Sequence, residues 1–276
     1  MLFDRVATFA RKCPRLPQGV AAVLLCETGM QVAASARRLE AQGAAAIILV
    51  GWETELDDIT VPVFRIAERP TQRNGWKLVN ALIVALSGRW LLWLWNGEFF
   101  VFPYGENRAL GDFTAFLSDE RRPAVFTYAL DLYANDLPGT VDDPRDEDLC
   151  FDRIGYHAFP GADHDLRLFG GLGWRFAEYA PAVMAQIGRA SLFRANRDVL
   201  LTRTYMFDNA EYNSVQCKWH HSPTAAMMTL RRSRRILAHP EFHRVRGKLI
   251  WAGSERFGWT SRQLLELGMI EPGQWF

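Results

Sequence analysis

The chain has 276 residues, of which 49% are hydrophobic and 13% aromatic, so it can bury a large core and is not a disordered protein. Its 32 basic and 31 acidic residues leave a net charge of +1, which excludes a whole-molecule field that would attract nucleic acid or an anionic membrane. Any anion-binding surface must therefore be local.

Four cysteines lie far apart and form no CxxC pair, which indicates reduced thiols and a cytoplasmic protein. The N-terminal residues carry charges throughout and lack the apolar core of a secretory signal. The longest apolar stretch, 78–102, is interrupted by Arg89, Asn96 and Glu98 and falls short of the roughly 20 clean apolar residues of a spanning helix. We expect no transmembrane segment, and a location in the cytoplasm or at the inner face of the membrane.

The first hundred residues alternate between short apolar runs, which predict buried strands, and segments with helical spacing of apolar residues. In chain order the predicted elements are a strand at 19–26, a helix at 30–42, strands at 44–50 and 61–66, a helix at 75–86 and a strand at 90–95. This order predicts an α/β fold with a mostly parallel, mixed central sheet flanked by helices.

The second half is less regular. It predicts a helix at 110–117, a strand at 124–130, a glycine-rich segment at 168–176, a strand at 189–194 and a helix at about 224–239. Six carboxylates between 138 and 152 are interpreted as a solvated loop, because their spacing does not follow a calcium-binding loop. No repeat and no clear linker divides the chain, so we expect a single domain over 1–276.

Ligands of parallel sheets bind where the carboxyl ends of strands open into loops. Three loops of this kind follow the predicted strands, at 27–29, 51–58 and 96–98. The last of them, Asn96-Gly97-Glu98, separates two strongly aromatic runs in the segment RWLLWLWNGEFFVF. It is either a simple turn or the remains of a working site.

The segment Leu94–Phe102, LWNGEFFVF, resembles the metal-binding strand of the family 2 glycosyltransferases with the GT-A fold, whose motif in one bacterial branch reads approximately L-D-x-D-E-F-F-V-Y. Four further segments are similar to parts of that family in the same order: FTYALDLY at 126–133, FGGLGWRF at 169–176, QCKWHHS at 216–222, and the ending GWTSRQLLELG at 258–268. The resemblance implies a GT-A-like, Rossmann-like domain. Its nucleotide-sugar-binding half is 1–103, and its acceptor half with the C-terminal helices is 104–276.

The resemblance also implies an activity: transfer of a sugar from a nucleotide-sugar donor to a polysaccharide or other glycan acceptor. It implies donor-binding roles for Cys26, Glu27, Thr28, Gly51, Trp52, Trp95, Asn96, Glu98 and Arg175. It further implies catalytic roles for Asp131 and His221, and Glu98 and His220 as ligands of a divalent cation, Mn²⁺ or Mg²⁺. The residues alone do not select the general base among Asp131, Asp163 and Asp165, nor which of the two histidines faces the cleft.

The chain departs from the family at the motif itself, because Trp95 and Gly97 stand where its two aspartates are expected. One carboxylate, Glu98, holds a divalent cation poorly. We therefore expect a transferase that is metal-independent or impaired. The alternative is a catalytically inactive relative that acts as a binding or scaffolding module.

The segment 230–248 is strongly basic, with four arginines between 231 and 235 followed by Arg244, Arg246 and Lys248. Such a cluster suits anionic lipid head groups or nucleic acid, and it is also typical of a solvated helix face, which we favour. We expect no nucleic-acid partner, and peripheral membrane contact, if the protein makes any, through 230–248.

Overall fold

The predicted strands and helices of the first hundred residues form, with small shifts at their ends. The strands are β2 (Ala21–Leu25), β3 (Ala46–Val50), β4 (Val63–Ile66) and β5 (Trp90–Trp95), and the helices are α2 (Val32–Ala41) and α3 (Gly75–Ala85). Helix α2 ends where Gly43, with φ of 84°, allows the amide of Ala44 to bond back to the carbonyl of Leu39. The computed structural model describes residues 1–134, 148–160, 166–177, 186–213, 216–217, 220–240 and 249–275.

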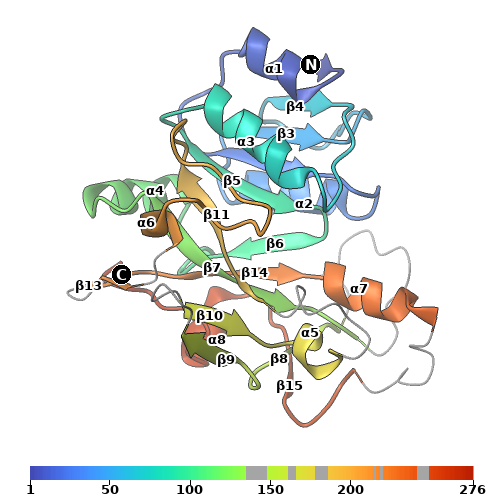
Figure 1. Ribbon diagram of the computed structural model, residues 1–276, viewed down its shortest axis with the longest axis vertical. Helices are drawn as coiled ribbons and strands as arrows, with labels where there is room; N and C mark the ends of the chain where they lie inside the picture. Colours follow the sequence, from blue (N-terminus) through green and yellow to red (C-terminus); the bar gives the residue numbers. More distant parts are fainter. Residues whose placement is uncertain are drawn as a thin grey trace.

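A large mixed sheet forms the centre of the protein, and helices flank it on both faces (Figure 1). Within the described residues its nine strands follow the order β1-β4-β3-β2-β5-β11-β7-β14-β6. Besides the strands given above, the sheet contains β1 (Leu2–Phe3), β6 (Glu98–Val101), β7 (Ala124–Asp131), β11 (Gly188–Arg194) and β14 (Ala225–Thr229). Strands β7 and β11 correspond to the strands predicted at 124–130 and 189–194. The expected α/β fold is thus confirmed, and it is compatible with a Rossmann-like domain.

Side-chain alternation along β2 divides the apolar core into two layers. Ala21, Val23 and Leu25 join the layer under α1 (Val6–Lys12) and α3, whereas Ala22 and Leu24 join the layer under α2 and α4 (Leu110–Asp119). Every residue of β2 and β3 is buried, which explains why their sequences read as continuous apolar runs.

Strand directions bring several strand ends to one edge of the sheet. Strands β1 to β5 run parallel to each other, and β7 and β14 share their direction. Strands β11 and β6 run the opposite way. The carboxyl ends of β2, β5, β7 and β14 therefore lie at the same edge as the first residues of β11 and β6.

The insert Asn96-Gly97 is a two-residue link between strands that do not pair with each other. Strand β5 pairs with β2 and β11, and β6 pairs with β14, so three strands separate β5 from β6 in the sheet order. Because the link is so short, the end of β5 and the start of β6 must lie side by side. The sheet consequently curves round this edge.

The second half differs from the expectations in several places. The helix expected at 224–239 is wrong in its first part, since the structure has β14 there and only then α7 (Arg231–Ala238). The apolar stretch of β14 pairs with β7 and β6, and this long-range pairing overrides the helical pattern. The glycine-rich segment forms β10 (Leu166–Phe169) and α5 (Leu172–Arg175).

The remaining elements are short, and the spacing of apolar residues does not predict them. They are β8 (Cys150–Asp152), β9 (His157–Pro160), α6 (Ala210–Asn213), β12 (Gln216–Cys217), β13 (His220–His221), β15 (Ser254–Arg256) and α8 (Ser261–Glu266). Most of the acidic segment 138–152, as well as Asp163, Asp165 and 241–248, lies outside the described residues. Among the helices of the described residues, none has the length and apolar character needed to cross a membrane.

Candidate functional site

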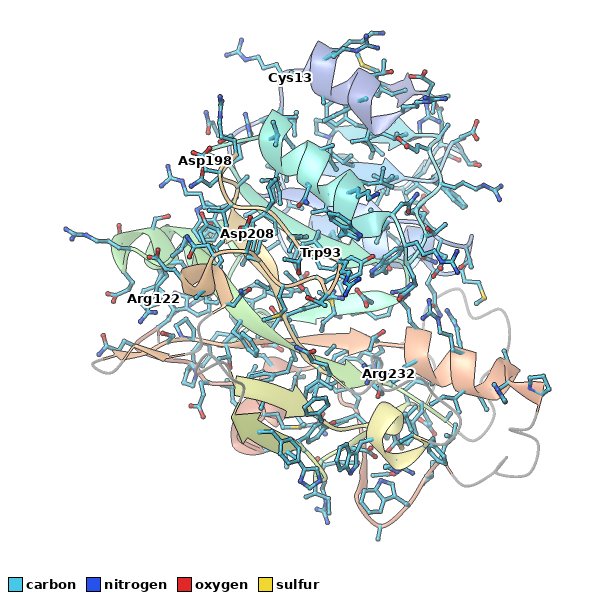
Figure 2. All side chains as sticks on the ribbon, viewed as in Figure 1. Cys13, Trp93, Arg122, Asp198, Asp208 and Arg232 are labelled. Carbon is cyan, nitrogen blue, oxygen red and sulfur yellow. The ribbon has the colours of Figure 1, made fainter. Side chains whose placement is uncertain are left out.

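An arginine-lined cavity of about 430 Å³ opens at the edge where these strand ends converge. The arginines in its lining are Arg189, Arg203, Arg231, Arg232 and Arg235. Aromatic rings of Trp93, Trp95 and Tyr205 form an apolar part of the same wall. Figure 2 labels Trp93 on β5 and Arg232 on α7, which are two of the elements that meet here.

Glu98, the first residue of β6, is almost fully buried at this edge. Arg189 donates to both of its carboxylate oxygens, at 3.1 and 2.6 Å, and the amide of Trp95 donates to Oε2 at 2.9 Å. Burial alone would raise the pKa of Glu98, but the charges of Arg189 and Arg231 outweigh it and hold the pKa below its ordinary value. Glu98 is therefore a charged anchor for Arg189 at neutral pH.

Glu27 plays a similar part for the arginines of α7. Its Oε2 accepts hydrogen bonds from Arg231 at 2.6 Å and from Arg235 at 3.4 Å. The guanidinium of Arg231 also lies 4.0 Å from the ring centroid of Trp95, a cation–π contact. The loop after β2 thus holds the start of α7 over the end of β5.

Asn96 fixes that loop through both ends of its amide. Its Nδ2 donates to the carbonyl and hydroxyl of Thr28 and to the carbonyl of Met30, at 2.8 to 3.1 Å. Its Oδ1 accepts from the amide of Glu27 at 2.9 Å. The polar insert of the sequence is therefore a structural clamp at the edge of the cavity.

Three residues expected to bind the donor, Cys26, Gly51 and Trp52, do not line the cavity. They lie in or next to the loop that follows β2. Cys26 is buried, and burial raises the pKa of its thiol. Gly51 has φ of 86°, and a Cβ there would approach the carbonyl oxygen of Cys26 to 2.6 Å. The ring of Trp52 packs against Gly29.

Asp131, at the end of β7, is also buried at this edge. Its Oδ2 accepts from Arg232 at 2.8 Å and from the amide of Leu172 at 2.9 Å, while its buried Oδ1 has no partner among the described residues. Burial raises its pKa, and the charge of Arg232 only partly offsets this. Asp131 does not itself line the cavity; it holds Arg232, which does.

The structure does not bring Arg175 to the cavity. Its guanidinium bonds to the carboxylate of Asp152 at 2.8 Å and to the carbonyl of Leu249 at 2.6 Å. It lies 4.8 Å from the ring centroid of Trp251. Arg175 thus belongs to a separate buried network in the second half of the chain.

His220 and His221 form β13, a few residues before the start of β14. Because β14 ends at the cavity edge with Thr229, its start lies at the opposite edge of the sheet, and Figure 1 shows β13 and α7 at opposite ends of β14. The backbone of these two histidines is therefore not placed beside Glu98.

The residues around Glu98 do not fit a divalent cation. Both carboxylate oxygens already accept hydrogen bonds from Arg189. No group of three His, Cys, Asp or Glu side chains is arranged to hold a metal within the part of the chain that the structure describes. Cation binding at Glu98 would require Arg189 to leave a buried ion pair.

The charges of the cavity leave a positive surplus. Glu98 pairs with Arg189, Glu27 with Arg231 and Arg235, and Asp131 with Arg232. Within the described part of the chain, five lining arginines against these three carboxylates leave two positive charges in excess. Arg203 is exposed and makes no hydrogen bond or ion pair with the described residues.

The sequence predicted the carboxylates and the amide of this site, which are Glu27, Asn96, Glu98 and Asp131, but it did not predict most of its arginines. The cluster at 231–235 was visible and was interpreted as a solvated face. Arg189 begins a predicted strand, and nothing in the local sequence distinguishes Arg203 from other exposed arginines.

The fold and the cavity together define an α/β protein with a basic, aromatic-walled cavity at the carboxyl edge of its sheet. No family model matches the chain, and no curated protein matches it. Among solved structures it is similar to HddC from Yersinia pseudotuberculosis, with 10% identity and a TM-score of 0.31 over 77% of this chain and 91% of that chain. A likeness at this TM-score supports no conclusion about function.

Proposed function

We propose that the cavity binds the diphosphate of a nucleotide-sugar, and that the protein is a GT-A-like glycosyltransferase that moves the sugar to a glycan acceptor. The observation that carries this proposal is the convergence of five arginines with surplus positive charge on one cavity. Guanidinium groups recognise phosphate oxygens through paired, charge-assisted hydrogen bonds.

The position of the cavity supports a nucleotide ligand. The chain adds β3 and β4 on one side of β2 and then places β5 on the other side, so the strand order reverses between β2 and β5 although the two strands are parallel. Open α/β sheets bind nucleotides at such a switch point. The loop fixed by Asn96 and the ion pair of Glu27 with Arg231 both lie there.

The charge of the cavity supports transfer without a metal. When a sugar leaves a nucleoside diphosphate, negative charge develops on the departing phosphate and must be stabilised. Among the described residues Arg203 has no competing partner, and Arg231 and Arg235 share a single carboxylate, so these guanidinium groups are the ones available for that role.

For the acceptor side we propose Asp131 as the base. A general base needs a pKa near the working pH, and burial raises the pKa of Asp131 in that direction. Its Oδ1, which has no partner among the described residues, would take the proton, and this step requires Arg232 to move aside because Asp131 does not line the cavity. The acceptor, its class as a glycan and a cytoplasmic location remain predictions from the sequence resemblance.

A second candidate function is a binding module without catalysis. It is favoured by one observation: the three carboxylates at this edge are all ion-paired with arginines. Such a module would use the cavity to hold a phosphate-bearing ligand and would not turn it over.

Titration calorimetry with a panel of nucleoside diphosphate sugars tests the proposal. We expect saturable binding of at least one donor, weakened about tenfold by Arg203→Gln, since one charge-assisted hydrogen bond is lost. The exposed Arg197, which lies outside the cavity, gives the matched control Arg197→Gln. The absence of binding across the panel would refute a donor site, and binding without sugar release or transfer would favour the module.

A further inference from the structure

A cluster of four aromatic rings lies next to the arginine-lined cavity, outside the residues considered so far. It consists of His157 and Phe159 of β9, Phe169 of β10 and Trp174 of α5. The ring centroid of Trp174 lies 5.1 Å from that of His157, 6.2 Å from that of Phe159 and 6.3 Å from that of Phe169. Figure 1 shows β9, β10 and α5 in the lower part of the molecule. We call these four side chains the aromatic platform.

Strand pairing explains why the rings of the platform share one face. Strands β9 and β10 are antiparallel, with His157 directly opposite Phe169, and opposite residues of such a pair point to the same face. Phe159 lies two residues after His157 and therefore points to this face as well. The chain then turns through Gly170 and Gly171 into α5, which brings Trp174 against the same rings.

The platform is open to solvent. Phe159 is 44% exposed and Trp174 is 43% exposed, and His157 is exposed too. The indole N–H of Trp174 and the imidazole of His157 make no hydrogen bond with the described residues. Large aromatic side chains that gather on a surface, unlike scattered ones, mark a place where another molecule binds.

The platform continues directly from the wall of the arginine-lined cavity. Two residues of that wall, Gln186 and Ile187, pair with β10. Gln186 forms an antiparallel bridge with Phe169, and the amide of Ile187 donates to the carbonyl of Leu168 at 2.9 Å. Neighbouring strands lie about 4.8 Å apart, so β10 lies about 5 Å and β9 about 10 Å from this part of the wall.

The platform is also joined to the proposed base. Asp131 accepts a hydrogen bond at 2.9 Å from the amide of Leu172, the first residue of α5, and Trp174 lies two residues further on. A molecule lying on the platform can therefore extend into the region between Asp131 and the cavity. A flat surface such as a bilayer cannot do so, but one end of a flexible oligomer can.

The chemistry of the platform matches sugar rings. A pyranose has apolar C–H faces and hydroxyl groups around its rim, and the hydroxyl groups both donate and accept hydrogen bonds. An indole or imidazole offers an apolar face for stacking and a polar group at its edge. Several adjacent rings therefore suit an oligosaccharide of more than one sugar unit.

We propose that the aromatic platform binds the acceptor glycan, whose sugar rings stack on Trp174 and Phe159 while its reacting end extends toward the arginine-lined cavity. This inference rests on the transferase function proposed above and gives the second substrate a surface of its own. None of the four platform residues lines the cavity, so acceptor binding and donor binding can be changed separately.

An oligosaccharide array that includes neutral, acidic and amino sugars tests the platform, with labelled protein titrated over it. We expect the wild type to bind at least one glycan. Trp174→Ala and Phe159→Ala should each raise the half-saturating protein concentration at least about tenfold, because a central aromatic contact is lost. Trp174→Phe keeps a ring and should lose less. Val84→Ala, at a 49% exposed apolar residue of α3, is the matched control and should bind as the wild type does.

Calorimetry with nucleoside diphosphate sugars separates this proposal from the donor site. Arg203→Gln should weaken donor binding and leave glycan binding unchanged, whereas Trp174→Ala should do the reverse. Donor binding without any glycan bound on the array overturns the platform and leaves the donor site standing. Glycan binding that depends on Trp174, without donor binding, supports the platform and refutes the donor site.

Two further outcomes overturn the proposal. One is glycan binding that persists in both alanine variants. The other is binding to phosphatidylglycerol vesicles that Trp174→Ala abolishes, with no glycan bound, because this would assign the platform to a membrane surface. Since Phe159 and Trp174 belong to different elements and both are exposed, one variant stays informative if the other fails to fold.

Discussion

Glu98 neutralises a buried guanidinium, so its replacement by glutamine should be costly although the two side chains have the same shape. The variant leaves Arg189, whose side chain is 11% exposed, without its counter-ion. We expect Glu98→Gln to lose about 3–5 kcal/mol of unfolding free energy at neutral pH, measured by urea denaturation. The exposed Glu120 provides the control Glu120→Gln, for which little change is expected.

The same residue predicts a pH dependence. Since the folded-state pKa of Glu98 lies below the ordinary value of 4.5, its stabilisation is present above that pH and is lost as the pH falls through the lowered pKa. The difference in unfolding free energy between wild type and Glu98→Gln should therefore shrink on acidification below 4.5. A difference that already shrinks well above pH 4.5 would contradict the assignment of the lowered pKa.

Glu27 competes with any phosphate for the same arginines. Its carboxylate occupies Arg231 and Arg235, and the Glu27 side chain is 32% exposed, so it can be displaced. We expect Glu27→Gln to bind a nucleoside diphosphate several-fold more tightly than wild type does, because binding no longer breaks an ion pair. Calorimetry with UDP measures this, with Glu53→Gln as a control at an exposed site outside the cavity. Weaker binding would show that Glu27 positions the arginines and does not compete with the ligand.

At the scale of elements, the start of α5 depends on a glycine. Gly171 has φ of 64°, and a Cβ on it would come within 2.5 Å of Asp131 Oδ2. Gly268 has the same φ, but nothing lies within 4 Å of a Cβ there. We expect Gly171→Ala to cost more unfolding free energy than Gly268→Ala, by about 1–3 kcal/mol, in parallel urea titrations. Equal losses would mean that Asp131 and α5 separate easily.

Elements with a local cause were predictable, and elements made by distant pairing were not. Strands β2 to β5 and helices α2 and α3 follow from apolar runs and helical spacing within their own residues. The segment 94–102, which resembles a single metal-binding strand, instead forms the end of β5 and then β6, because β6 reverses direction to pair with β14, more than a hundred residues later. The same pairing turned the expected start of a helix at 224 into a strand.

At the scale of the whole molecule, the near-zero net charge means that anion binding depends on local groups such as the arginines of the cavity. We predict that replacing Mn²⁺ by EDTA leaves the affinity for a nucleoside diphosphate sugar unchanged, because arginines and not a cation meet its charge. Raising the ionic strength should weaken binding, since salt screens the partly exposed guanidinium groups. Calorimetry in both buffers measures this, and affinity that requires Mn²⁺ would refute metal-independent binding.

Only the part of the candidate site that lies at the carboxyl ends of the parallel strands was predictable from the sequence. Glu27, Asn96, Glu98 and Asp131 all follow or end predicted strands, and the rule that such ends share one edge places them together. The arginines come from the start of β11, the segment at 203 and the start of α7. Their meeting depends on how the sheet curves, which no local pattern of residues encodes.

The curved sheet described above also bears on how the chain folds. The free edges of β5 and β6 stay unpaired until β11 and β14 have been synthesised, and both of those strands come from the second half. Contacts between residues so distant in the chain slow folding and leave intermediates open to aggregation. A fragment ending at residue 103 would expose the aromatic edge of β5, so the nascent chain gains its cavity only when the C-terminal half joins the sheet.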